Sequence, residues 1–150
     1  MDTNVLIIGY GNPLRGDDGL GWAAAEMLDG LTDPAHVEII TCQQLTPDLA
    51  EAISRAAQVI FIDAAVEGTP GEVQIRPLTA LPAPDDGTFT HHLDAPGLLE
   101  LAASLYDVAP PAHLVTVRGF DFSFRDGLSD EMAAVLNEVV MAVLGLIQTP

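Results

Sequence analysis

The chain has 150 residues, enough for one domain, spanning residues 1–150, with a substantial hydrophobic core. Apolar side chains make up 49% of it, so a disordered chain is excluded. Its 22 acidic residues stand against five arginines and no lysine. The resulting net charge of −17 argues against nucleic acid or an anionic membrane surface as a partner.

The first half of the chain alternates apolar runs with helical patterns. Residues 5–8 are continuously apolar, which is typical of a strand buried on both faces. A helical pattern runs from Asp18 to about Leu28, and a second strand is expected at 37–41. Thr46 is expected to be the N-cap of the next helix, with Pro47 in its first position. Residues 59–62 are a third, fully apolar strand that ends at Asp63.

The second half continues the alternation. Residues 72–76 alternate in polarity, which predicts a strand at the edge of the sheet. Asp94 is expected to cap a helix, residues 113–117 to form a strand, and Ser129 to cap the last helix. The alternation predicts a three-layer α/β fold, with a mostly parallel, twisted sheet of about five strands and helices on both faces.

Other features of the chain exclude several kinds of chemistry and location. The single cysteine, Cys42, excludes an intrachain disulfide and is interpreted as a small buried residue, not a nucleophile. His36 and His113 stand in no context that suggests a role. The N-terminus lacks the features of a signal peptide, and the apolar run at 139–147 is too short to span a bilayer. We therefore expect a cytoplasmic protein with no membrane partner.

The loop after the first strand is rich in glycine and ends in two adjacent carboxylates, Asp17 and Asp18. It lacks the third glycine of a dinucleotide-binding motif, and those two acids replace the Lys-Ser/Thr pair of a phosphate-binding loop. Carboxylates repel phosphate, so the loop is suited to a cation or to acid/base chemistry. The alternative is that both aspartates only cap the helix that follows.

Three polar features occupy equivalent positions in the predicted fold: the Asp17–Asp18 pair, Asp63, and the His91–His92 pair. Because the carboxyl ends of parallel strands share one edge, carboxylates and an imidazole can converge there. Two oxygen ligands and one nitrogen ligand suit a divalent ion such as nickel, zinc or manganese. Simpler interpretations stay open, namely a loop cap for Asp63 and a solvated histidine pair.

Four segments carry a family resemblance when taken together. The most specific is residues 9–21, which read GYGNPLRGDDGLG. The others, in chain order, are Ile62-Asp63-Ala64, Thr90-His91-His92 with the later Leu98-Leu99, and Gly127-Leu128-Ser129. The chain thereby resembles the hydrogenase maturation endopeptidases over nearly its whole length. The resemblance implies a twisted sheet between helices. It also implies removal of a C-terminal extension from the large subunit of a nickel–iron hydrogenase after nickel insertion.

The resemblance also implies a site. The family's metal-contacting residues correspond here to Asp18, Asp63 and His91. They are implied to act in catalysis and to engage nickel that the substrate presents. Counting back from Leu98-Leu99 favours His91, and Thr90 before it fits the family pattern. His92 stays an alternative because loops fix register poorly. Asn12 is expected to shape the glycine loop, and Asp17 to cap the following helix and orient its neighbour.

The implied partner is a nickel–iron hydrogenase large-subunit precursor, and the implied activity is that of an endopeptidase. Two alternatives stay open. One is a metal-dependent hydrolase of the same fold with another substrate, and the other is a non-catalytic nickel chaperone for hydrogenase assembly. Four apolar residues either form a partner surface or belong to the core: Phe120, Phe122, Phe124 and Leu81.

Overall fold

The computed structural model describes residues 5–80 and 93–147. Its centre is a single sheet whose strands lie in the order β2-β1-β3-β5-β4. The strands are β1 (Val5–Tyr10), β2 (Val37–Cys42), β3 (Gln58–Ala65), β4 (Val73–Leu78) and β5 (Ala112–Arg118). All neighbouring strands pair in parallel except β4, which runs antiparallel to β5 at one edge. The expected sheet of about five mostly parallel strands, with an edge strand near residues 72–76, is confirmed.

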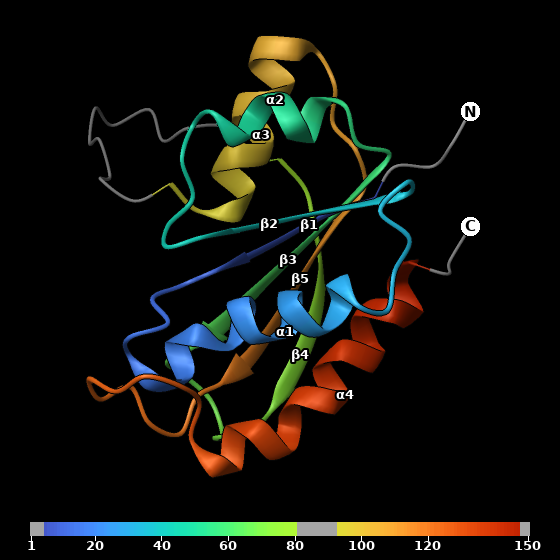
Figure 1. The fold of residues 1–150 in the computed structure, drawn as a ribbon. Coiled ribbons are helices and arrows are strands. Elements are labelled where there is room, and N and C mark those ends of the chain that lie inside the picture. Colours follow the sequence, from blue (N-terminus) through green and yellow to red (C-terminus); the bar gives the residue numbers. More distant parts are fainter. Residues whose placement is uncertain (1–4, 81–92, 148–150) are drawn as a thin grey trace, which may run out of the picture.

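Helices cover both faces of this sheet, so the expected three layers are confirmed (Figure 1). The helices are α1 (Leu20–Asp29), α2 (Leu49–Ser54), α3 (Ala95–Tyr106) and α4 (Asp130–Ile147), and a short 3-10 turn, η1 (Gly16–Gly19), precedes α1. Helices α1 and α4 pack on one face, and α2 and α3 on the other. Within the described residues, no helix is both long enough and apolar enough to cross a membrane.

Strand residues are divided between two hydrophobic clusters because successive side chains point to opposite faces of a sheet. Ile7 and Ile62 pack with α1 and α4, whereas Ile8 and Phe61 pack with α2 and α3. All four side chains are fully buried. Burial on both faces explains the continuous apolar runs in the sequence of β1 and β3.

Two expected helix caps are confirmed. The Asp94 side chain accepts a hydrogen bond from the Gly97 N–H at 2.8 Å and begins α3. The Ser129 hydroxyl oxygen accepts one from the Met132 N–H at 3.1 Å and begins α4. A third prediction was wrong, since Thr46 is not the N-cap of α2. That helix begins at Leu49, and the carbonyl of Thr46 instead accepts a bond from the Leu49 N–H in a preceding turn.

Two further boundaries differ from expectation in ways that matter for the site. The helix expected from Asp18 begins only at Leu20, because the residues before it form the turn η1. Strand β3 extends beyond Asp63 to Ala65, because residues 63–65 continue their pairing with β5. Asp63 therefore lies within a strand and not in a loop after it.

Candidate functional site

The candidate site lies at the carboxyl ends of β1 and β3. These strands are neighbours in the sheet, but α1 leaves β1 along one face while α2 leads into β3 along the other. Such a switch in direction leaves a crevice outside the strand ends, where ligands bind in open α/β sheets. Asp18 follows β1, and Asp63 lies near the end of β3. Both predicted carboxylates therefore occupy the switch point of the sheet.

The β1–α1 loop folds back so that Asp18 lies beside the end of β1. Gly11 has φ +138°, and a Cβ added there would lie 2.1 Å from the Asp18 carbonyl oxygen, so only glycine fits. The Asn12 N–H donates to Asp18 Oδ2 at 2.7 Å, and the Asn12 side chain accepts from the Leu14 N–H at 2.9 Å. Asn12 thus shapes the loop and orients the Asp18 carboxylate.

The start of α1 lies directly over the ends of β1 and β3. A Cβ added at Gly21 would lie 2.6 Å from the Tyr10 nitrogen and 2.7 Å from the Ile62 oxygen. One turn of the loop is also held by Trp22, whose indole N–H lies 2.9 Å from the Gly11 oxygen and 3.2 Å from the Cys42 oxygen. These contacts fix the backbone on which Asp18 is placed. No role for Trp22 could be seen in the sequence, because both of its acceptors belong to other elements.

Asp63 is half-buried and sits next to a like charge. Burial raises the pKa of its carboxyl to about 7. The Ala64 N–H, which donates to Asp63 Oδ1 at 2.8 Å, lowers this pKa, whereas the negative charge of Asp18 raises it. Repulsion of this kind requires the two carboxylates to be close together. The effect of Asp18 on this pKa agrees with the predicted convergence of the two carboxylates, which stays a prediction.

Tyr10 completes this part of the site, although the sequence analysis did not single it out. Its ring packs edge-on against Phe61, with centroids 6.4 Å apart, on the face covered by α2 and α3. Burial raises the pKa of its hydroxyl, and the charge of Asp63 raises it further, followed by a smaller effect of Asp94. A hydrogen bond from this hydroxyl lowers the pKa of Asp63. The alternation of strand side chains was the available signal, since it places Tyr10 on the face of Ile8.

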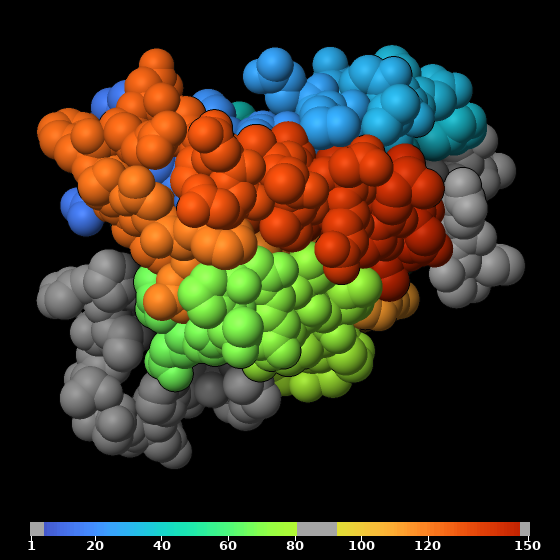
Figure 2. Space-filling view, turned by 90° about the horizontal axis from the view of Figure 1, so that it is seen from below, coloured from blue at the N-terminus to red at the C-terminus, as the bar shows by residue number. Residues whose placement is uncertain are grey.

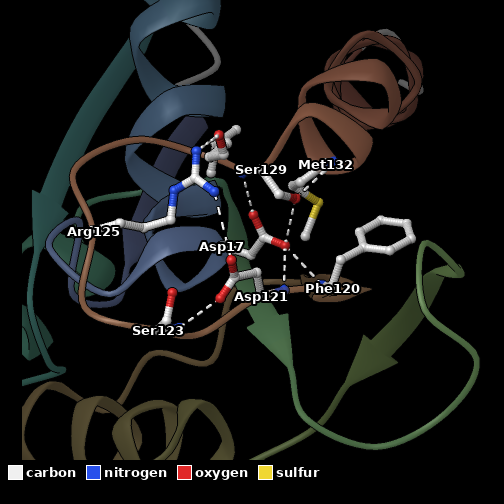
Figure 3. A network of polar contacts seen from close by, with 8 residues as sticks. Asp17, Phe120, Asp121, Ser123, Arg125, Ser129 and Met132 are labelled. Atoms are coloured by element: carbon white, nitrogen blue, oxygen red, sulfur yellow. Dashed lines mark hydrogen bonds and ion pairs between the residues drawn. The ribbon is translucent and has the colours of Figure 1, made fainter.

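Asp17 makes different contacts from those of Asp18, and they are shown in Figure 3. It does not cap α1, because Gly19 occupies that position and makes no side-chain cap bond. Its fully buried carboxylate instead reaches the segment that joins β5 to α4. There it accepts hydrogen bonds from the N–H groups of Phe120, Asp121 and Ser129 and from the Ser129 hydroxyl, at 2.7 to 2.9 Å.

The environment of Asp17 keeps it ionised. Burial acts to raise the pKa of the Asp17 carboxyl, but the backbone donors together outweigh it, so the pKa lies below its ordinary value. The prediction that Asp17 caps the following helix was wrong. Its bonds to Ser129 place it at the start of α4, the last helix of the chain.

The predicted histidine ligands cannot be placed. His91 and His92 lie outside the described residues, as does Leu81. Within 5–80 and 93–147, no three histidine, cysteine or acidic side chains come together as a metal site. Asp94, two residues after His92 in the sequence, begins α3, and its charge raises the pKa of Tyr10.

Other residues considered in the sequence fall outside the site or have structural surroundings. Burial raises the pKa of the Cys42 thiol, which disfavours the reactive thiolate. His36 lies on the surface with its Nε2 3.8 Å from an Asp33 oxygen. Of the aromatic residues after β5, Phe122 packs against the core, whereas Phe124 is 84% exposed.

The fold and these contacts define a three-layer α/β protein that holds two neighbouring carboxylates at the switch point of its sheet. No protein-family model matches the chain. Among curated proteins, it is 28% identical to the "Putative hydrogenase maturation protease MJ0253" of Methanocaldococcus jannaschii, over 97% of each chain.

Solved structures agree with this result. The hydrogenase maturating endopeptidase HybD of E. coli superposes with a TM-score of 0.77 at 23% identity, covering 97% of this chain and 93% of HybD. The [NiFe] hydrogenase maturation protease HycI of Thermococcus kodakarensis KOD1 gives 0.76 at 21% identity, covering 98% and 94%. The resemblance to the hydrogenase maturation proteases is therefore confirmed, and in fold it extends over nearly the whole chain.

Proposed function

We propose that this chain is an endopeptidase that removes the C-terminal extension of a nickel–iron hydrogenase large-subunit precursor after nickel insertion. The observation that carries the proposal is the meeting of Asp18 and Asp63 at the switch point of the sheet. It occurs in a chain that resembles maturation proteases over nearly its full length. The cytoplasmic location expected from the sequence belongs to the same proposal.

Nickel belongs to the substrate in this proposal. Asp18 and Asp63 supply oxygen ligands, and His91 supplies the nitrogen ligand. His91 stands three residues before Asp94, and three residues of extended chain span at most about 11 Å. The charge of Asp94 raises the pKa of Tyr10, which lies on β1 close to Asp63, so the chain just after His91 leads to this end of the sheet. Binding to nickel held by the precursor restricts cleavage to precursors that have received the metal.

The carboxylates also suit the chemistry of peptide hydrolysis. A group whose pKa lies near the working pH is an efficient proton carrier, and the pKa of Asp63 is raised to about 7. When Asp63 is not bound to nickel, it can accept a proton from the attacking water and return it to the leaving amine. Asp18 remains available to hold the metal-bearing end of the substrate. Nickel in the substrate can polarise the scissile carbonyl.

The test compares nickel-loaded and nickel-free hydrogenase precursor, with loss of the C-terminal peptide followed by mass spectrometry. We expect cleavage of the loaded form only, and loss of cleavage in Asp18→Asn, Asp63→Asn and His91→Ala. His92→Ala separates the two candidate ligands, and His36→Ala is the matched control on the remote surface. Full activity in all three site variants contradicts the proposal.

Two outcomes would favour the alternatives. Stable binding of the loaded precursor without cleavage indicates a nickel chaperone. A metal ion that stays with the purified protein through chelation, together with hydrolysis of unrelated peptides, indicates a metal-dependent hydrolase with another substrate.

A further inference from the structure

Two loops join at the rim of the candidate site and present four side chains there. Arg15 in the β1–α1 loop and Arg125 in the segment before α4 form an isolated parallel β-bridge. The Arg125 N–H donates to the Leu14 oxygen at 2.9 Å, and the Gly16 N–H donates to the Arg125 oxygen at 3.1 Å. We call Leu14, Arg15, Phe124 and Arg125 the rim surface. In Figure 2, the segment after β5 (orange) projects from one end of the molecule beside the N-terminal segment (blue).

The rim surface exposes large apolar groups. Phe124 is 84% exposed and Leu14 is 49% exposed, although each directly precedes a bridged arginine. Burial of an exposed phenylalanine side chain against a partner is favourable, because it removes apolar surface from water. Aromatic side chains are also enriched in protein interfaces. These two residues are therefore suited to packing against a partner.

The charges of the rim surface differ from those of the whole molecule. The net charge is −17, yet two of the five arginines are held side by side here. Arg15 forms no ion pair with any residue that the structure describes, whereas Arg125 pairs with Asp121 at 3.5 Å and donates to the Leu128 oxygen at 3.4 Å. The guanidinium group of Arg15 is therefore available to a carboxylate-bearing partner.

The rim surface is continuous with the candidate site and is rigidly held. Leu14 and Arg15 lie in the loop whose two ends are joined by the bond between the Asn12 N–H and Asp18. The other loop is anchored by Asp17, which accepts hydrogen bonds from Phe120 and Asp121. A partner seated on the rim surface therefore also lies next to the Asp18 carboxylate.

We propose that the rim surface is the docking site for the hydrogenase precursor, and that it binds a segment carrying carboxylates next to apolar side chains. This inference rests on the function proposed above and adds a recognition surface to it. Phe124 and Leu14 contribute apolar contact, and the guanidinium groups of Arg15 and Arg125 bind the carboxylates. The site carboxylates then act on a substrate that is already oriented.

The experiment measures the affinity of nickel-loaded precursor for the protein by calorimetry, separately from cleavage. Leu14→Ser with Phe124→Ser should raise Kd and KM by about tenfold or more, with kcat at saturation unchanged. Added salt should raise Kd less in Arg15→Gln than in the wild type, because the variant lacks one of the charges that salt screens. Leu105→Ser, at a 61% exposed position near the far end of α3, and Arg76→Gln on β4 are the matched controls.

Unchanged affinity in the rim variants, or an equal loss in the controls, overturns the proposal. The proposal also fails if sedimentation shows a wild-type dimer that the rim variants dissociate, because the surface would then bind a second copy. Binding and cleavage are measured separately. A wild type that binds precursor without cleaving it contradicts the proposed function, and the rim variants still test the docking surface.

Discussion

Replacing Asp63 with asparagine should stabilise the protein at neutral pH while it removes activity. Asparagine keeps the size of the side chain and an oxygen that accepts the hydrogen bond of the Ala64 N–H. It removes the carboxyl that burial and the charge of Asp18 disfavour in its ionised form. The substitution is therefore expected to raise the free energy of unfolding and to lower the activity.

The magnitude follows from the pKa of Asp63, which is raised from 3.8 to about 7. The folded protein binds this proton more tightly than the unfolded chain, so the free energy of unfolding falls as pH rises through that window. At about 1.4 kcal/mol per pKa unit, the full effect is at most about 4 kcal/mol. Roughly 2 to 3 kcal/mol of it falls between about pH 5 and pH 8. In Asp63→Asn, the free energy of unfolding should not fall in this way as pH rises.

Urea unfolding of chelated protein at several pH values provides the assay, with circular dichroism as the probe. The difference in free energy of unfolding between Asp63→Asn and wild type should grow steadily from pH 5 to pH 8. Comparing the two proteins cancels the titration of the other acidic groups. A difference that does not change with pH refutes the assignment of a raised pKa to Asp63.

Three further changes test the surroundings of the site. Asp17→Ala leaves three backbone donors and the Ser129 hydroxyl without their acceptor, and should lower the free energy of unfolding by roughly 3 kcal/mol or more in urea denaturation. Because the pKa of Asp17 is lowered, this contribution is present at neutral pH and should disappear as pH falls below its ordinary value. Gly21→Ala places a Cβ 2.6 Å from the Tyr10 nitrogen and should lower the melting temperature, at a cost of about 1 to 3 kcal/mol. Tyr10→Phe removes the hydroxyl that lowers the pKa of Asp63, so the NMR titration of the Asp63 carboxyl should move to higher pH.

The sheet and its layers could be predicted because their signals are local. Strands β1 and β3 are buried on both faces and therefore read as continuous apolar runs, while edge strand β4 alternates in polarity. Asp94 and Ser129 could be identified as caps because a cap bonds to a residue only three positions away. The start of α2 was misplaced because Thr46 and Pro47 form a turn whose sequence resembles a cap.

The contacts of Asp17 could not be predicted, because its partners lie more than 100 positions away in the sequence. A capping preference is a local rule and assigns such an aspartate to the nearest helix. Tyr10 was missed for a related reason. Its role depends on the ends of two other elements, β3 and α3, which meet it only in the folded protein.

Asp17 and Asp18 are identical neighbours, and the number of hydrogen-bond donors around each explains why only one suits substrate binding. The acceptors of Asp17 are occupied by four donors from the far end of the chain, which leaves none for a ligand. Asp18 accepts a single bond from a residue that the structure describes, the one from the Asn12 N–H, and it is partly exposed at the switch point. The charge of Asp18 also raises the pKa of Asp63. One carboxylate of the loop therefore joins distant parts of the chain, and the next one has the free acceptors that the proposed function requires.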